Sequence, residues 1–251
     1  VAPDAKVDAR ARVCAAASSG KYGQREVVIR VNSIGTQWHE DDLAAAAKAG
    51  PAAVLVPKIN SASDVQSIER ALEQGGAPEH TMIWAMLETP IAMLHAEEIC
   101  GASKRLTVLV LGNNDLANEL HAEHVPGRAP LLGGMSLALL AARATGKVIL
   151  DGVYNDVSDL DGFTAECKQG RQLGFDGKTL IHPKQIEPCN TAFAPSEKEI
   201  ASSQRIIEAF EEAQRAGRGV VTVDGRMIEN LHVDNARRVL AVAAAIGALD
   251  Q

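Results

Sequence analysis

The chain has 251 residues, of which 46% are hydrophobic and 23% are charged, a length and composition that suit one large α/β domain or two small ones. Its formal net charge of -7 is spread along the sequence with no cluster of Lys and Arg residues, which excludes the basic surface of a nucleic-acid-binding protein. No apolar run approaches the roughly 20 residues that span a bilayer, and the four cysteines lack C-x-x-C spacing, so we expect a cytoplasmic protein with reduced thiols that binds neither nucleic acid nor a membrane.

Short β-branched segments alternate with longer, Ala-rich segments of helical spacing, which is typical of parallel α/β proteins. The predicted strands, in chain order, are Val27–Val31, Ala53–Pro57, Met82–Leu87, Thr107–Leu111, Val148–Leu150 and Gly177–Ile181. The predicted helices between them are Glu40–Ala49, Ser63–Gln74, Ile91–Cys100, Leu137–Thr145 and Phe163–Leu173. About six βα units result, a number that an open doubly wound sheet can use, whereas a closed barrel needs eight strands.

Polar residues at the ends of the predicted strands favour the barrel. They are Arg30, Asn32, Lys58, Glu88, Asp115 and Asp151, and barrel enzymes build their sites at the C-terminal ends of their strands. Residues 1–6 lead directly into a helix with no strand before it, as if the N-terminus of a longer barrel had been cut. We therefore predict that residues 1–194 form an α/β domain, a (β/α)8 barrel of the TIM type that is incomplete at its N-terminus.

Residues 195–251 are predicted to form a separate extension of helix, hairpin and helix. The first helix begins at Pro195 with Ser196 as its cap and runs to about Ala216. The hairpin joins Val220–Val223 to Arg226–Ile228 through the turn Asp224-Gly225, and a final helix follows from about Val233 to Ala248. The apolar face of that helix has to be buried somewhere and consists of Val233, Ala236, Val239, Leu240 and Ala243. We expect the extension to be a lid or an oligomerisation segment, with Val220–Gln251 packed mainly against another protomer.

Two carboxylates follow neighbouring predicted strands. Glu88 comes directly after the strand that ends at Leu87, and Asp115 lies just beyond the strand that ends at Leu111. Consecutive strands of a parallel barrel bring such residues together, and two carboxylates with waters suit Mg²⁺, which prefers oxygen ligands. The alternative is that both acids cap the helices that follow them, because acids favour helix N-termini.

Arg30 is a charged residue in an otherwise apolar strand, so its guanidinium needs an anionic partner. It can hold a substrate carboxylate or stabilise an enolate oxygen through charge-assisted hydrogen bonds. A structural ion pair to a neighbouring strand is the alternative.

Several motifs, in this order, resemble the CoA-ester lyase family of the HpcH/HpaI aldolase superfamily. They are Arg30-Val31-Asn32, Glu88-Thr89, the segment from Gly112 to Leu116, Asp151-Gly152-Val153 and the segment from Gly174 to Pro183. This family includes the citrate lyase beta subunit, malyl-CoA lyase and (3S)-malyl-CoA thioesterase. The segments from Trp84 to Thr89 and from Glu229 to His232 are most similar to the thioesterase branch.

The resemblance implies a (β/α)8 TIM-type barrel whose first two strands precede the start of this chain. It implies that Glu88 and Asp115 bind Mg²⁺ and that Arg30 and Glu88 bind the substrate, with Arg30 also taking part in catalysis. It further implies a homotrimer, or a multiple of it, in which the C-terminal hairpin and helix cover a neighbouring protomer's site. The family's catalytic Asp is replaced here by Glu229, which is one methylene longer.

The activity implied is Mg²⁺-dependent carbon–carbon cleavage of a 3-hydroxyacyl-CoA such as malyl-CoA, which yields a 2-oxo acid and acetyl-CoA. Hydrolysis of the (3S)-malyl-CoA thioester is a first alternative. A citrate lyase beta-like subunit that acts only with partners is a second, against which the presence of Arg30, Glu88 and Asp115 argues.

Overall fold

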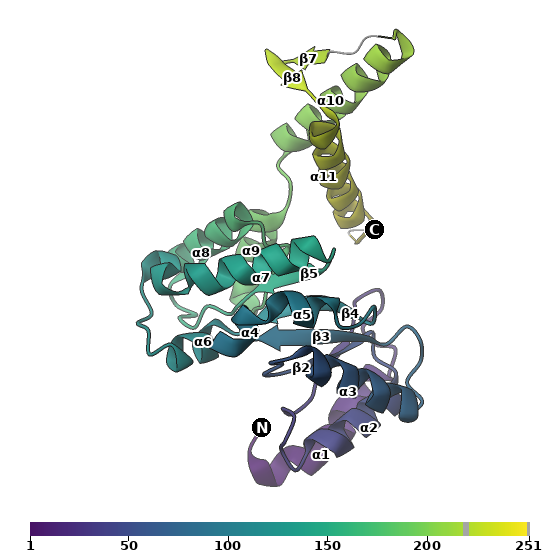
Figure 1. Cartoon of the computed structure of the whole chain (residues 1–251), viewed down its shortest axis with the longest axis vertical. Helices are drawn as coiled ribbons and strands as arrows, with labels where there is room; N and C mark the ends of the chain where they lie inside the picture. Colours follow the sequence, from purple (N-terminus) through teal and green to yellow (C-terminus); the bar gives the residue numbers. More distant parts are fainter. Residues whose placement is uncertain (218–220, 250–251) are drawn as a thin grey trace. The chain divides into compact units, whose positions relative to one another are not determined.

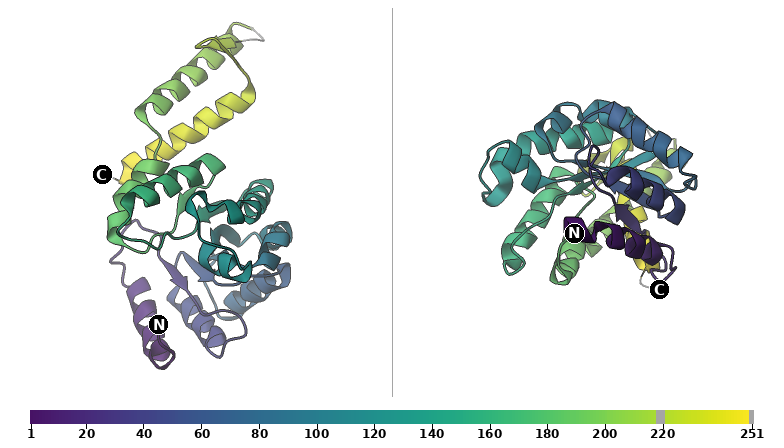
Figure 2. Two further views of the ribbon diagram at one scale, coloured as in Figure 1. Left: turned by 90° about the vertical axis from the view of Figure 1, so that its left-hand side faces the viewer. Right: turned by 90° about the horizontal axis from the view of Figure 1, so that it is seen from below.

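The computed structural model describes residues 1–217 and 221–249, and the chain divides into two compact units, Val1–Ala192 and Phe193–Gln251. The first unit contains a curled sheet with helices on its outside (Figures 1 and 2). Its strands are β1 (Val28–Arg30), β2 (Ala53–Val56), β3 (Met82–Leu87), β4 (Leu106–Leu111), β5 (Val148–Asp151) and β6 (Gly177–Lys178).

The six strands of this sheet are hydrogen-bonded in the order β1-β2-β3-β4-β5-β6, and every neighbouring pair is parallel. A doubly wound sheet reverses its strand order at a switch point, and no reversal occurs among the described strands. The strands therefore form a curled half-barrel of the TIM type, and the predicted α/β barrel class is confirmed.

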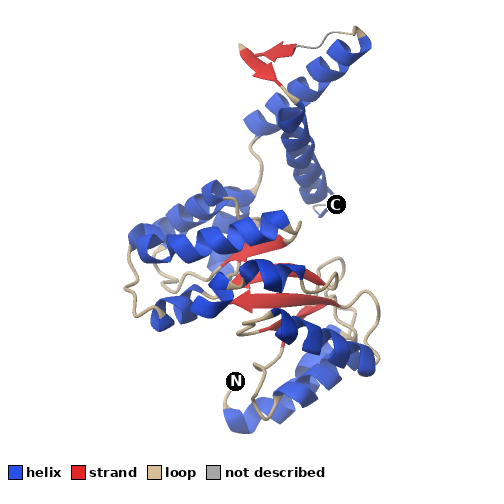
Figure 3. Ribbon diagram, in the orientation of Figure 1, coloured by secondary structure: helices blue, strands red, loops and turns tan. Residues whose placement is uncertain are grey.

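Helices connect consecutive strands, so that each strand is followed by a crossover segment (Figure 3). The helices of this unit are α1 (Lys6–Ala17), α2 (His39–Ala49), α3 (Ala62–Gln74), α4 (Pro90–Leu94), α5 (Ala96–Gly101), α6 (Asn113–Glu119), α7 (Leu132–Ala144), α8 (Leu160–Leu173) and α9 (Ile186–Phe193). Short 3-10 helices are η1 (Pro3–Ala5), η2 (Pro126–Leu131) and η3 (Pro183–Gln185).

Alternation along β3 assigns its side chains to two faces. Ile83, Ala85 and Leu87 are fully buried, whereas the residues between them are half-buried. Met82 and Trp84 line a hollow of about 370 Å³ together with residues of β4 and β5. Because side chains on a strand point alternately to opposite faces, Glu88 continues the row of Met82, Trp84 and Met86 and emerges where this inner face ends.

One prediction about the helices of this unit is wrong. The segment Ile91–Cys100 is not one helix, because it is divided at His95 into α4 and α5. The His95 backbone leaves the helical region (φ -100°, ψ 13°), and its ring nitrogen Nδ1 lies 3.3 Å from the Asn60 carbonyl oxygen.

The second unit is a helix, a hairpin and a helix: α10 (Glu197–Arg215), β7 (Val221–Val223), β8 (Arg226–Ile228) and α11 (Asn230–Leu249). The Ser196 cap is confirmed, since its hydroxyl accepts from the Glu199 N–H while the Glu199 carboxylate accepts from the Ser196 N–H. The turn places Asp224 (φ 50°) and Gly225 (φ 77°) in the left-handed region, as a two-residue hairpin turn requires. Of the predicted extension, residues 218–220 and 250–251 lie outside the described residues.

Part of the apolar face predicted for the last helix is covered within this unit. The helices α10 and α11 pack against each other, and Val233 and Ala236 are 2% and 1% exposed. These two residues are therefore buried within the chain itself, and packing of the rest of the face against another protomer stays a prediction. Among the described residues, no helix combines the length and apolarity needed to cross a bilayer.

Candidate functional site

Glu88 lies at the C-terminal end of β3 with a buried side chain, 3% exposed. Its Oε1 accepts a hydrogen bond of 2.9 Å from the backbone N–H of Lys58, which follows β2. Lys58 has a φ of 53°, a left-handed conformation that is strained for a side chain with a Cβ. Gly112, which follows β4, packs so closely on Glu88 that a Cβ there would clash with the Oε2 and Cβ atoms of the carboxylate side chain.

Asp115 lies in the first turn of α6, directly beyond β4. Its Oδ1 is 3.3 Å from the ammonium nitrogen of Lys58, and Oε1 of Glu119 is 3.8 Å from the same nitrogen. Lys58 thus joins both carboxylates, Glu88 through its backbone and Asp115 through its side chain.

Charged groups that follow neighbouring strands affect the pKa of Glu88. Burial and the negative charge of Asp115 raise the pKa of Glu88, while the Lys58 N–H and the positive charges of Lys58 and Arg30 act in the opposite direction. The hydrogen bond to Asp115 raises the pKa of Lys58, against the effect of burial. Asp115, Lys58 and Arg30 therefore each lie within range of the Glu88 charge.

The alternative that Glu88 caps the following helix is wrong. Thr89 is the cap of α4, because its Oγ1 accepts from the Ala92 N–H at 3.1 Å, and Glu88 accepts from Lys58 instead. The helix α6 has no side-chain cap at all, and the Asp115 carboxylate points to Lys58.

Arg30 ends β1 with an exposed side chain and lines a pocket of about 300 Å³ between α1 and β1. No ion pair ties Arg30 to a neighbouring strand within residues 1–217 and 221–249, so the structural alternative has no support there. Its guanidinium remains available to an anionic ligand.

A divalent cation fits the carboxylate pair. Glu88 is buried with one hydrogen-bond donor and with the negative charge of Asp115 within range, so a small dication would relieve the repulsion between the two carboxylates. No group of three or more His, Cys, Asp or Glu side chains suited to a metal occurs in the described part of the chain. Two carboxylates that leave most positions to water and substrate suit Mg²⁺ better than Zn²⁺.

Glu229 belongs to the second unit, between β8 and α11, and its side chain is exposed. Its backbone N–H donates to Nδ1 of His232 at 3.0 Å, and its carbonyl accepts from the His232 N–H at 3.0 Å. These bonds fix the backbone at the start of α11 and leave the carboxylate free to meet a ligand.

Comparison with known proteins identifies the family. The family model described as HpcH/HpaI aldolase/citrate lyase matches residues 1–183. The chain belongs to this family. A second model, described as a C-C bond lyase of the TIM-barrel fold, matches residues 135–248. The resemblance seen in the motifs is confirmed, and the chain is a member of an enzyme family.

Two relatives cover nearly the whole chain. The (3S)-malyl-CoA thioesterase of Cereibacter sphaeroides is 48% identical over 248 residues, which are 99% of this chain and 85% of that protein. The citrate lyase subunit beta of Escherichia coli is 37% identical over 247 residues, 96% of this chain and 82% of that protein.

Solved structures of the HpcH/HpaI family show the same fold. Protein CitE from Mycobacterium tuberculosis, in complex with magnesium, acetoacetate and coenzyme A, has a TM-score of 0.74 at 28% identity and covers 97% of this chain and 86% of its own. A citrate lyase from Burkholderia xenovorans has a TM-score of 0.81 at 21% identity, over 95% of this chain and 79% of its own. The second likeness supports the fold alone.

Lys58 is the site residue whose role the sequence did not reveal. It appears among the polar residues at strand ends, yet a lysine after a strand is also typical of a solvated loop. Its strained backbone and its contacts with both carboxylates become visible only in three dimensions.

Proposed function

We infer that the protein is a Mg²⁺-dependent enzyme that acts on a small 3-hydroxyacyl-CoA thioester of the malyl-CoA type. The observation that carries this is the 48% identity to (3S)-malyl-CoA thioesterase across 99% of the chain. The carboxylate pair of Glu88 and Asp115 supports it, as do the magnesium and coenzyme A with which CitE from Mycobacterium tuberculosis forms its complex.

Glu88 and Asp115 would hold the Mg²⁺. When bound, the ion would fix the carboxylate and hydroxyl oxygens of the substrate and lower the pKa of that hydroxyl. Lys58 holds Asp115 in place through its ion pair and Glu88 through its backbone N–H. Arg30 would bind the substrate carboxylate or the oxygen on which negative charge develops.

Two outcomes are open to a substrate held in this way. In cleavage, a base takes the proton of the hydroxyl, the carbon–carbon bond breaks, and malyl-CoA yields glyoxylate and the enolate of acetyl-CoA, which then takes up a proton. In hydrolysis, water adds to the thioester carbonyl, the carbon–sulfur bond breaks, and malate and CoA are released. The thioesterase relative favours hydrolysis, and the C-C bond lyase model favours cleavage.

We assign Glu229 as the base in cleavage. Its carboxylate is exposed in the second unit, where a neighbouring protomer of a homotrimer would bring it to the carboxylate pair. In this proposal residues 1–194 carry the metal and the acyl group, and residues 195–251 act as the lid.

The direct test incubates the purified protein with (3S)-malyl-CoA and Mg²⁺ and quantifies both product pairs by liquid chromatography. Malate with free CoA would support hydrolysis, and glyoxylate with acetyl-CoA would support cleavage. Turnover that begins only when acyl-carrier partner subunits are added would support the citrate lyase beta-like alternative and overturn the proposal of an autonomous enzyme. Unchanged substrate in every case would overturn the assignment of the substrate.

A further inference from the structure

A second set of charged side chains lies behind the carboxylate pair, at the ends of β5 and β6. Asp151 ends β5 and Lys178 ends β6, and the two are register partners in the sheet. Both side chains are fully buried. Lys178 Nζ lies 3.0 Å from Oδ2 of Asp151 and 2.6 Å from Oε1 of Glu166 on α8. Arg128 Nη1 is 2.7 Å from Oδ1 and 2.8 Å from Oδ2 of the same Asp151 carboxylate. Arg128, Asp151, Glu166 and Lys178 are called the buried ion cluster below.

The buried ion cluster is costly to form. Arg128 has a φ of 55°, a conformation in which a residue with a Cβ is strained by about 1–3 kcal/mol. Its Nη2 is buried and has no hydrogen-bond partner in the described chain, and an unsatisfied buried donor costs about 1–3 kcal/mol. Apolar residues of similar volume often serve stability as well as a buried ion pair does. Destabilising arrangements of this kind concentrate where the position of a functional group has to be fixed.

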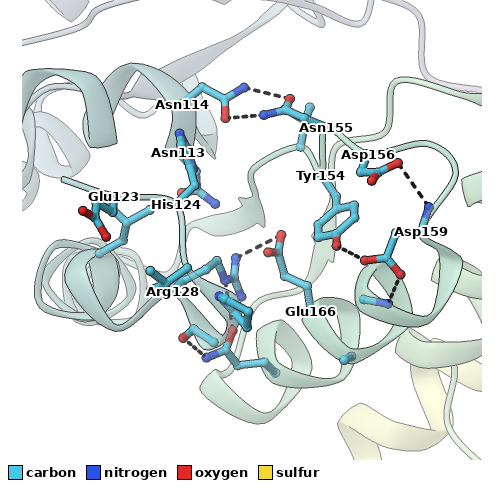
Figure 4. A pocket seen from close by; sticks show the side chains of 18 residues that line it. Asn113, Asn114, Glu123, His124, Arg128, Tyr154, Asn155, Asp156, Asp159 and Glu166 are labelled. Atoms are coloured by element: carbon cyan, nitrogen blue, oxygen red, sulfur yellow. Dashed lines mark hydrogen bonds and ion pairs between the residues drawn. The ribbon is translucent and has the colours of Figure 1, made fainter. Parts of the chain in front are cut away.

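The cluster connects directly to the helix that carries Asp115. Oδ1 of Asp151 accepts a hydrogen bond of 3.2 Å from the side-chain amide of Asn113, the first residue of α6. The next residue, Asn114, forms a reciprocal pair of amide hydrogen bonds, 3.0 and 2.8 Å long, with Asn155 in the loop after β5. Figure 4 shows Asn114 and Asn155 facing each other across this contact, with Arg128 directed at Glu166 lower in the view.

Close packing completes the contact between the β5 loop and α6. A Cβ on Gly152 would lie 2.7 Å from Nδ2 and 2.8 Å from Cγ of Asn113, so only glycine leaves the Asn113 side chain in its place. Residues at and after the end of β5 therefore fix both residues that precede Asp115. Asp151 and Gly152 fix Asn113, and Asn155 fixes Asn114.

We propose that the buried ion cluster and Asn155 position the first turn of α6 and thereby set Asp115 for metal binding. The inference rests on the proposed function, in which Asp115 is a metal ligand. In this proposal these residues are positioning residues and not metal ligands. They act through α6, as outer partners act on a metal ligand, and loss of such a partner typically weakens metal binding by about 10–100-fold.

The chain offers a matched control at the opposite end of the same strands. Asp176, just before β6, accepts from Arg143 at 2.9 Å and from the backbone N–H of Ile149 at 2.9 Å. It thus also pairs an aspartate with an arginine at the edge of the sheet, but it has no contact with α6. Asp176→Asn should therefore lower stability without altering the metal site.

The experiment measures the Kd of Mn²⁺, a stand-in for Mg²⁺ with the same preference for oxygen ligands, by electron paramagnetic resonance without substrate, alongside the thermal midpoint of each variant. Asp151→Asn should weaken Mn²⁺ binding by about 10–100-fold, whereas Asp176→Asn should change it by less than about twofold although its midpoint also falls. Asn155→Ala changes no charge and lies on the surface, so it folds even where Asp151→Asn does not. It should weaken binding by about 10-fold, at the low end of outer-partner effects.

Lower thermal midpoints with an unchanged Mn²⁺ Kd in both Asp151→Asn and Asn155→Ala would overturn the inference, because the cluster would then be merely structural. Weaker binding in Asp151→Asn alone would also overturn it, since that result would follow from the lost charge. Failure of the wild-type protein to bind Mn²⁺ at all would instead overturn the metal site in the proposed function, and the inference with it.

Discussion

Two residues fix the Glu88 carboxylate through their backbones. Lys58 adopts a left-handed conformation with a φ of 53° and directs its N–H at Glu88 Oε1. Gly112 leaves the space that the carboxylate side chain fills. Lys58 is strained and Gly112 lacks a Cβ, and both contact the Glu88 carboxylate. Strain of this kind is typical of functional sites, where a precise geometry is kept at the expense of stability.

Gly112→Ala tests this packing. The added methyl would displace Glu88, so we expect metal binding and turnover to fall by at least about 10-fold and the free energy of unfolding to fall by about 1–3 kcal/mol. Gly133→Ala in α7 is the control, because a Cβ there meets nothing within 4 Å and should stabilise the helix by up to about 1 kcal/mol. Urea unfolding measures the change in the free energy of unfolding of each variant, and Mn²⁺ titration measures the change in its metal binding. Full activity in Gly112→Ala would show that the position of the Glu88 carboxylate is not critical for turnover.

Glu229 controls the outcome of the reaction if it is the base. Cleavage needs a base within hydrogen-bond reach of the substrate hydroxyl, whereas hydrolysis needs only a polarised thioester carbonyl near water. We expect Glu229→Asp to shift the products toward glyoxylate and acetyl-CoA, by up to about 100-fold if the extra methylene misplaces the base by about 1 Å. Both product pairs are compared in wild type, Glu229→Asp and Glu229→Ala. Equal rates and ratios in all three proteins would remove Glu229 from the site.

At the scale of elements, one carboxylate ties the first helices to the first strand. Asp42 on α2 accepts from Arg10 on α1 at 2.7 Å and from the backbone N–H of Asn32 beyond β1 at 3.2 Å. Burial alone would raise the pKa of Asp42, but the hydrogen bonds from Arg10 and Asn32 outweigh it and hold the pKa below its ordinary value. The folded state therefore favours the charged carboxylate.

Asp42→Asn should lower the free energy of unfolding at pH 7 by about 1.5–3 kcal/mol, the range for hydrogen bonds to charged groups. Because the pKa of Asp42 is lowered by folding, the wild-type advantage is full above the ordinary value of about 3.9 and is lost as the pH falls through the lowered pKa. Asp41→Asn is the control, because Asp41 pairs with the same Arg10 but its side chain is 73% exposed. We expect this variant to lower the free energy of unfolding by less than about 1 kcal/mol. Urea unfolding at several pH values would refute this account if the two variants behaved alike.

The sequence alone predicted those helices and strands whose pattern lies within the segment itself. Hydrophobic periodicity predicted all six strands of the sheet and most of its helices, and Ser196 marked the start of α10. The division of α4 from α5 depends on His95 meeting Asn60, a contact between residues far apart in the chain. The motif order pointed to Glu88 and Asp115, but Lys58 and the buried ion cluster emerge only when separate strand ends meet.

At the scale of the whole molecule, the second unit keeps apolar side chains on its surface. Met227 and Leu231 are 59% and 61% exposed, and Val242 and Ile246 are each 38% exposed. Exposed apolar side chains such as these can form part of a surface that another molecule covers. A neighbouring copy of the chain is the partner that the family resemblance implies.

We therefore expect a homotrimer, with a mass by light scattering three times the 26.5 kDa of the chain. Leu231→Asp should shift the protein toward single chains and lower turnover, because the extension would no longer reach a neighbour's site. A mass of one chain at every concentration would contradict the trimer, because the extension could then cover only the site of its own chain.

Consumption of a malyl-CoA-type thioester should depend on a Mg²⁺ that Glu88 and Asp115 hold. The most direct measurement follows the disappearance of (3S)-malyl-CoA by liquid chromatography with Mg²⁺ or with EDTA, in wild type, Glu88→Gln and Asp115→Asn, all confirmed as folded by circular dichroism. We predict rapid consumption by wild type with Mg²⁺ only, and rates lower by more than about 100-fold in both variants, beyond the effect of losing an outer partner. Equal consumption with EDTA, or undiminished turnover in either variant, would contradict this assignment.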